Sequence, residues 1–169
     1  MFLRVASGLA LLLATASCAG DTTGTASLPW QNGEVVQRID LTGDGKQELV
    51  VDPHDGATAH TIAIASLEGR ATKHIRSPEG DELRLLRYQN SMCCLHEMVG
   101  VKCVESAVDG RLELLEFKVN DETADWEYTT YRIDKDRAQV VARGRSVDGA
   151  SFPGGLPTAG GYQCRATTY

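Results

Sequence analysis

The residues best suited to chemistry are the oxygen-bearing side chains of one short segment, DLTGDGKQE, at positions 40–48. Its oxygen donors recur at alternate positions: Asp40, Thr42, Asp44, the main-chain carbonyl of Lys46, and Glu48. A hard cation such as Ca²⁺ takes about six to eight oxygen ligands, which a tight turn can supply from alternate residues. Gly45 permits the positive φ that such a sharp turn requires. The segment therefore predicts a Ca²⁺ site, in which Lys46 turns its ammonium group toward solvent.

The residues around this segment distinguish between kinds of calcium loop. Counting Asp40 as position 1, position 12 is Val51, where an EF-hand loop carries Glu, and no helix signal flanks the segment. The pattern Asp-x-x-Gly-Asp-Gly-x-x-Glu-Leu-Val-Val, within residues 38–52, instead resembles the Ca²⁺-binding loop of FG-GAP/VCBS-type β repeats. In that family the loop joins two strands of a β-propeller blade. The resemblance implies that the side-chain ligands are Asp40, Asp44 and Glu48.

Two departures from the family pattern bear on the expected affinity. Thr42 stands where Asn or Asp is usual, and the carboxylate at position 12 is missing. Because a neutral hydroxyl is a weaker ligand than a carboxylate, we expect a dissociation constant on the order of 10⁻⁵–10⁻³ M, as in extracellular modules. Asp52 is a candidate auxiliary ligand. The competing interpretation is a solvated hairpin tip, which Asp-Gly turns commonly form.

The cysteines indicate an oxidising compartment. Four of them follow the N-terminal region: Cys93, Cys94, Cys103 and Cys164. A soft-metal site made with His96 and Met98 is disfavoured, because no C-x-x-C spacing is present and exported thiols usually oxidise. The even number favours two disulfides. A bond between the adjacent cysteines would close a strained ring. Since neighbours on a strand point to opposite faces, we expect one to reach Cys103 across a hairpin and the other to reach Cys164.

The remaining polar residues do not predict catalysis. Three further histidines are present: His54, His60 and His74. No nucleophile motif, His-Glu-x-x-His pattern or phosphate-binding loop accompanies them in the sequence. Two carboxylate pairs can be considered for glycoside hydrolysis: Glu113 with Glu116, and Asp134 with Asp136. Charged residues on exposed strand faces are the commoner explanation, and we expect a protein that is not an enzyme.

The elements that must position these residues are short strands. From about Trp30 onward, runs that alternate apolar and polar residues are separated by Gly-containing turns, the main local signal for hairpins. The predicted strands are 34–39, 48–51, 60–66, 70–76, 82–88, 100–105, 111–119, 126–133 and 139–143. Their spacing of about 8–15 residues indicates one all-β domain. We expect an antiparallel meander of about 8–10 short strands, arranged as propeller-like blades, a sandwich or a barrel.

Three stretches do not follow this strand pattern. A helical turn at residues 83–86 and a short helix at residues 91–98 remain alternatives. Residues 148–161 are rich in Gly, Pro and Ala and are expected to be irregular. The segment Tyr162-Gln-Cys164 follows, and a disulfide could fix it in place.

The first residues predict export. Residues 1–17 have the pattern of a signal peptide, with one positive charge at Arg4. The apolar stretch at residues 5–14 is too short to span a bilayer. This N-terminal part is therefore excluded from the expected fold.

The next residues predict lipid attachment. Residues 15–18 resemble the lipobox of bacterial lipoproteins, in which Cys18 becomes the lipidated first residue. Cleavage after Ala16 by ordinary signal peptidase is the alternative. Residues 18–29 then form a flexible tether rich in Gly, Thr and Ser, and residues 30–169 form the β domain.

A net charge of −6 without a cluster of Lys or Arg argues against nucleic acid and against electrostatic binding to a membrane surface. The N-terminal lipid would then be the attachment to the membrane. We expect a lipoprotein of the bacterial cell envelope, facing the periplasm or the exterior, and in the outer membrane if the host is Gram-negative. Its predicted location and its loop resemble those of exported inhibitors and immunity proteins. The resemblance implies a protein partner such as a cell-wall-degrading effector enzyme. The alternatives are a structural envelope lipoprotein without a discrete partner, and a hydrolase with carboxylates near the ion.

Overall fold

The computed structural model describes residues 33–55, 59–69, 71–89, 97–120, 122–146, 152 and 161–164. These described residues contain ten strands and no helix, which confirms the all-β class. The strands are β1 (Glu34–Ile39), β2 (Glu48–Asp52), β3 (Ala59–Glu68), β4 (Ala71–His74), β5 (Arg84–Gln89), β6 (Glu97–Glu105), β7 (Leu112–Asn120), β8 (Trp126–Asp134), β9 (Arg137–Ser146) and β10 (Gly161–Gln163).

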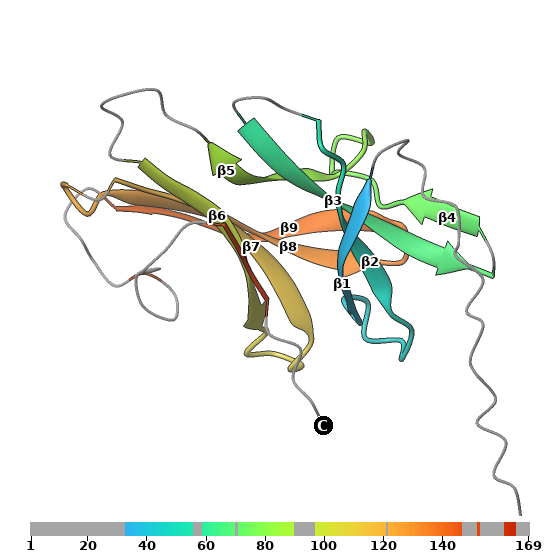
Figure 1. Ribbon diagram of the computed structural model, residues 1–169. Coiled ribbons are helices and arrows are strands. Elements are labelled where there is room, and N and C mark those ends of the chain that lie inside the picture. Colours follow the sequence, from blue (N-terminus) through green and yellow to red (C-terminus); the bar gives the residue numbers. More distant parts are fainter. Residues whose placement is uncertain are drawn as a thin grey trace, which may run out of the picture.

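The strands divide into two sheets that follow each other along the chain (Figure 1). β1 to β5 form the N-terminal sheet, and β6 to β10 form the C-terminal sheet. In the N-terminal sheet the order is β1-β2-β3-β4, and β5 also pairs with β3. β4 pairs with residues 65–68 of β3 and β5 with residues 59–63, so these two strands share one edge of β3 end to end.

The C-terminal sheet has the strand order β10-β6-β7-β8-β9. β6 to β9 form the expected antiparallel meander, whereas β10 pairs in parallel with residues 100–102 of β6. Within the described residues the strand order of each sheet is open, so neither sheet closes into a barrel. Of the three arrangements expected for an all-β meander, this one is sandwich-like.

The two sheets share one hydrophobic core. Its buried side chains come from both halves of the chain: Ile39, Leu41, Val50, Ile62, Ile64, Ile75, Leu83, Leu85, Val101, Leu114, Ile133 and Ala138. Ile62 and Ile64 contribute together because alternate residues of a strand point to the same face. Truncating a fully buried aliphatic side chain such as Leu114 to alanine would cost about 2–5 kcal/mol of unfolding free energy.

The opposite face of the C-terminal sheet carries a second, smaller core. Its buried residues are Leu115, Phe117, Val119, Trp126 and Phe152. The ring of Phe152 meets three aromatic neighbours edge-on, with centroid distances of 5.9, 5.4 and 5.8 Å: Phe117, Trp126 and Tyr128. Lys102 places its Nζ atom 4.6 Å from the centroid of the same ring. The segment between β9 and β10 therefore sets Phe152 on the outer face of the sheet.

The described C-terminal residues, 161–164, lie against the C-terminal sheet. β10 lies beside β6, and the Sγ atoms of Cys103 and Cys164 are 2.04 Å apart, at bonding distance. The expectation that each of these cysteines pairs with Cys93 or Cys94 is wrong, because the parallel register of β10 places Cys164 beside Cys103. Cys93 and Cys94 lie outside the described residues. The expectation that a disulfide holds the tail is confirmed.

β10 requires a glycine where it contacts β6. A Cβ atom on Gly100 would lie 2.4 Å from the carbonyl oxygen of Gly161 and 2.7 Å from the ring of Phe117. Any larger residue at this position would push β10 away from its partner strand, and the disulfide with it.

The helical alternatives are wrong where the structure describes them. Residues 84–86 belong to β5, and residues 97–98 begin β6. Residues 91–96 lie outside the described part of the chain. None of the described residues forms a helix that is long and apolar enough to cross a membrane.

Candidate functional site

Residues 40–47 connect β1 to β2 and close the first hairpin of the N-terminal sheet (Figure 1). Ile39 pairs with Glu48 at the last position of the ladder. Leu41 is fully buried in the shared core and anchors the start of the connection. Gly43 and Gly45 have φ angles of 71° and 83°, which glycine adopts without the strain that a Cβ atom would cause. The predicted turn is confirmed, and Leu41 is an anchor that the sequence pattern did not single out.

Asp40 is held by the main chain of this loop. Its Oδ1 accepts a hydrogen bond from the Gly43 N–H at 2.6 Å, and its Oδ2 accepts one from the Gly45 N–H at 2.9 Å. The Thr42 hydroxyl lies 3.4 Å from Oδ1. The carboxylate is therefore oriented by the turn, as a ligand at the first position of a cation loop must be.

Glu48 is the buried member of the loop, only 4% exposed. Its Oε2 accepts hydrogen bonds from the Leu41 N–H at 2.8 Å and the Thr42 N–H at 3.2 Å. Burial raises the pKa of Glu48, the two main-chain donors oppose that rise, and the negative charges of Asp40 and Asp44 add to it. An ionised carboxylate in such surroundings is costly unless a cation compensates its charge.

Thr42 lies among all three carboxylates. Its Oγ1 is 3.4 Å from Asp40 Oδ1 and 3.5 Å from Glu48 Oε1. Hydrogen bonds from the Lys46 N–H and the Thr42 hydroxyl hold the pKa of Asp44 below its usual value. A hydroxyl donates only one proton, so it can satisfy only one of these carboxylates at a time. Carboxylate and hydroxyl oxygens are the ligands that a hard cation such as Ca²⁺ takes.

Lys46 and Asp44 form the outer part of the loop. The Lys46 side chain is 77% exposed, as expected, and its Nζ lies 3.6 Å from Asp44 Oδ2. In the described part of the chain, no three His, Cys, Asp or Glu side chains are close enough together, as they stand, to hold a metal ion. The donor set suits Ca²⁺, but binding would require Asp44 to exchange its contact with Lys46 for the ion.

The loop lies against turns of the C-terminal sheet. Arg111 packs over Gly43, where an added Cβ atom would lie 3.0 Å from Arg111 Nε. The Nη2 atom of the same guanidinium donates a hydrogen bond to the main-chain carbonyl of Ile133 in β8, at 2.9 Å. On another side, a cavity separates the loop from residues 134–136. Lys73 lines that cavity and pairs with Asp136, Nζ to Oδ2, at 3.1 Å. The loop thus contacts the C-terminal sheet through Arg111 and faces its residues 134–136 across the cavity.

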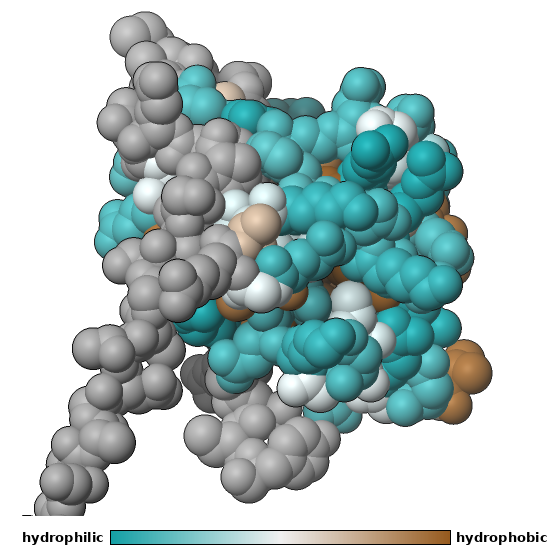
Figure 2. All heavy atoms as spheres, turned by 90° about the vertical axis from the view of Figure 1, so that its right-hand side faces the viewer, coloured by the Kyte–Doolittle hydropathy of each residue, from teal (hydrophilic) through white to brown (hydrophobic). Residues whose placement is uncertain are grey.

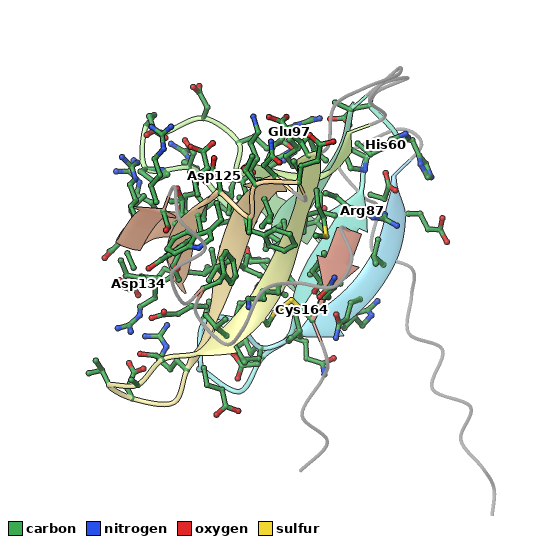
Figure 3. The ribbon with its side chains drawn as sticks, turned by 90° about the vertical axis from the view of Figure 1, so that its left-hand side faces the viewer. His60, Arg87, Glu97, Asp125, Asp134 and Cys164 are labelled. Carbon is green, nitrogen blue, oxygen red and sulfur yellow. A yellow bond between two sulfur atoms is a disulfide. The ribbon has the colours of Figure 1, made fainter. Side chains whose placement is uncertain are left out.

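Asp52 is not an auxiliary ligand of this loop. It ends β2, at the opposite end of the strand from Glu48. Its Oδ2 lies 2.8 Å from Arg87 Nη1, and its Oδ1 accepts the His54 N–H at 2.9 Å (Arg87 is labelled in Figure 3). With 9% exposure and both oxygens bonded, Asp52 links the N-terminal sheet internally.

Glu113 and Glu116 do not form a carboxylate pair. They are three residues apart on β7 and therefore point to opposite faces. Glu113 is 8% exposed and binds Arg132, Oε1 to Nη2, at 2.6 Å. Glu116 accepts the Leu86 N–H at 2.7 Å and lies 3.4 Å from the Tyr131 hydroxyl, and burial raises its pKa. The explanation that both lie on exposed strand faces is wrong.

The described histidines lie on separate elements. His54 follows β2, with Nδ1 3.3 Å from Asp52 Oδ1. His74 ends β4, with Nδ1 3.4 Å from Glu82 Oε1. His60 lies on β3 (Figure 3). His54 also places its Nε2 3.8 Å from Glu34 Oε2, so both His54 and His74 lie beside carboxylates of the N-terminal sheet and its connections.

The sequence pattern missed a polar surface on the C-terminal sheet. The strand registers align two rows of side chains across β6, β7, β8 and β9: Val99, Lys118, Glu127 and Arg145, and then Val101, Glu116, Thr129 and Arg143. They lie on the same face as Leu114, which packs in the shared core. This face therefore changes from apolar to charged along its length.

An open groove of about 600 Å³ follows these rows. Leu86 of β5 lines it beside the rows from the C-terminal sheet. Figure 3 shows Glu97 at one end of this sheet and Asp134 toward the other. Glu127 in the groove and Asp134, which lines the cavity beside residues 42–48, are separated by roughly 23 Å of strand β8. The groove and the loop are thus two distinct surfaces.

Comparison with known protein families, with curated proteins and with solved structures finds no match to this chain. The resemblance to FG-GAP/VCBS-type loops therefore rests on residues 38–52 themselves. Calcium binding, export and partner recognition are hypotheses that stand on the residues and contacts described above.

Proposed function

We propose that this chain is a non-catalytic, calcium-stabilised β domain of the bacterial cell envelope that binds a protein partner. The observation that carries the calcium site is the gathering of Asp40, Asp44 and Glu48 around the hydroxyl of Thr42. Three acidic side chains share one hydroxyl donor there, in a loop already shaped by glycines with positive φ.

Calcium would act as a staple for the first hairpin. Asp40, Thr42, Asp44 and Glu48 would supply side-chain oxygens, and Lys46 its main-chain carbonyl. The ion would compensate the charge of the buried Glu48 and fix the connection between β1 and β2. Because Arg111 packs over this loop, the fixed connection would also support the contact between the two sheets. The site then serves stability, and recognition falls to a surface elsewhere.

Export and lipid attachment are supported by residues 1–18, which lie outside the described residues. Lipidated Cys18, followed by a tether to residue 29, would hold the domain at the membrane while leaving it free to meet a soluble partner. The Cys103–Cys164 pairing suits an oxidising compartment. A secreted effector enzyme that attacks the cell wall is the kind of partner that this location favours.

The test is thermal unfolding of the mature chain, residues 18–169 with Cys18→Ser, with and without Ca²⁺. About 10 mM Ca²⁺ should raise the melting temperature, because a ligand that binds only the folded state stabilises it by mass action. Mg²⁺ at the same concentration should do less, since it demands a smaller, more regular site. An unchanged melting temperature with Ca²⁺ would refute the staple.

A further inference from the structure

In the described part of the chain, the second half of β9 forms one edge of the C-terminal sheet. At the start of the strand, the Arg76 N–H donates to the carbonyl of Asp136 at 2.8 Å and the Ala138 N–H donates to the carbonyl of Arg76 at 2.7 Å. Beyond this bridge, no other described strand pairs with the outer side of residues 139–145. Among the described residues, the outward main-chain donors and acceptors of this stretch have no partner strand, which is the condition for strand addition.

The same stretch carries positive charge on the groove side. Arg143 and Arg145 are exposed, line the groove and form no ion pair within the described part of the chain. Lys118, on the same face, pairs with Glu97 at 2.9 Å. The chain has a net charge of −6, but β9 carries Arg137, Arg143 and Arg145 and no acidic residue. Glu127 of β8 lies opposite Arg145 on the inner side of the strand, so the excess positive charge lies toward the sheet edge and forms a local site for negative charge.

Other occupants fit less well. In an antiparallel pairing of two β9 strands centred on this stretch, Arg143 and Arg145 of one copy would face the same residues of the other, and facing like charges are destabilising. The register shift in β9, beside the exposed Val141, also discourages self-pairing. The face shown in Figure 2, on the other side of the molecule, is mainly hydrophilic and offers only small apolar patches among its coloured residues.

We propose that residues 139–145 of β9, with Arg143 and Arg145, form the docking site for an extended acidic segment of a partner protein. The segment adds a strand to the edge of β9 through main-chain hydrogen bonds, as in known strand-addition complexes. Its alternate carboxylates meet the two arginines on the groove face of the sheet, while the side chains between them point to the opposite face. This inference rests on the proposed partner-binding function and names the surface that performs it.

The experiment selects binders for the mature chain from a display library of random peptides. Peptides enriched on the native chain should carry Asp or Glu at alternate positions. They should lose at least tenfold in affinity against Arg143→Glu and Arg145→Glu, and keep their affinity for Arg137→Glu, a change on the same strand outside the groove. Melting temperatures of the three variants verify that each is folded.

A second comparison separates strand addition from simple charge attraction. The best peptide is synthesised with N-methyl groups on alternate amides, which removes main-chain donors and keeps every charge, and with its sequence scrambled. Binding should be lost by N-methylation and by scrambling. Three outcomes would overturn the proposal. They are enrichment of peptides without acidic residues, binding to the Arg143→Glu and Arg145→Glu chains as tight as to the native chain, and unchanged binding of the scrambled peptide.

The result of this peptide experiment does not depend on whether the loop at residues 40–48 binds Ca²⁺. Glu48→Gln, tested at a temperature where it is folded, should abolish the response to Ca²⁺ and leave peptide affinity unchanged. A chain that responds to Ca²⁺ but selects no acidic peptide would refute the docking site alone.

Discussion

Replacing Glu48 by glutamine tests the calcium loop most sharply. The substitution keeps the size of the side chain and the carbonyl oxygen that can accept the Leu41 and Thr42 N–H groups, but it removes one of the three negative charges. Because Glu48 is buried and its pKa is raised by that burial, glutamine should cost little in the absence of Ca²⁺. The loss should appear only when the ion is present.

The magnitude follows from ligand linkage. For a dissociation constant of about 10⁻³ to 10⁻⁴ M, about 10 mM Ca²⁺ stabilises the native chain by about 1.4 to 2.7 kcal/mol. For a domain of this size, that corresponds to a rise in melting temperature of roughly 4–10 °C. Glu48→Gln and Asp44→Asn should each remove most of this rise, since each deletes a charge that the ion compensates.

The assay is thermal unfolding followed by circular dichroism, with CaCl₂ compared against NaCl at equal ionic strength to control for screening. Asp81→Asn is the matched control, because Asp81 is an exposed carboxylate in the turn before β5, outside the loop. A full calcium response in Glu48→Gln, or an equal loss in Asp81→Asn, would refute the reasoning.

Three further predictions concern other parts of the chain. Glu116→Gln should raise the melting temperature at neutral pH, because burial raises the pKa of Glu116 in the folded state and disfavours its ionised form. The gain in melting temperature over the native chain should shrink as the pH falls through that raised pKa toward the ordinary glutamate value of 4.5, because the native carboxyl is then protonated. The double substitution Cys103→Ser with Cys164→Ser should lower the free energy of unfolding by about 4 kcal/mol, because the disulfide closes a loop with a sequence separation of 61. Denaturant titration would measure this loss of unfolding free energy. Cys18→Ser should release the chain from the membrane fraction of a bacterial host, as fractionation and mass spectrometry of the N-terminus would detect.

Each of these has a distinct contrary outcome. A melting temperature for Glu116→Gln that stays below the native value at every pH would mean that the carboxylate stabilises this site. A disulfide-linked peptide joining Cys103 to another cysteine would contradict the pairing. An N-terminus without lipid, beginning after residue 16, would favour ordinary signal-peptide cleavage.

Strand positions were largely predictable because they depend on local patterns. β1 spans the predicted residues 34–39, and β8 extends the predicted 126–133 by one residue. Asp-Gly turns and alternation encode these elements within a few neighbouring residues. β10 was not predictable, because three residues within a Gly-rich tail form a strand only through their pairing with β6, about sixty residues earlier in sequence.

The candidate sites were predictable to different degrees. The proposed calcium loop is local, so its candidate donors could be listed from residue types alone, although the central position of Thr42 and the burial of Glu48 emerge only from the packing. Arg143 and Arg145 look like any solvated strand residues in the sequence. They are proposed as a site only because the strand registers place them on one face of β9, the edge strand of the sheet in the described part of the chain.

Isothermal titration of the mature chain with Ca²⁺ at neutral pH tests the central claim most directly. The loop predicts one saturable site, with a dissociation constant on the order of 10⁻⁵–10⁻³ M, that is absent in Glu48→Gln. No binding heat up to about 10 mM Ca²⁺, together with an unchanged melting temperature, would contradict the claim and leave residues 40–48 as a solvated hairpin tip.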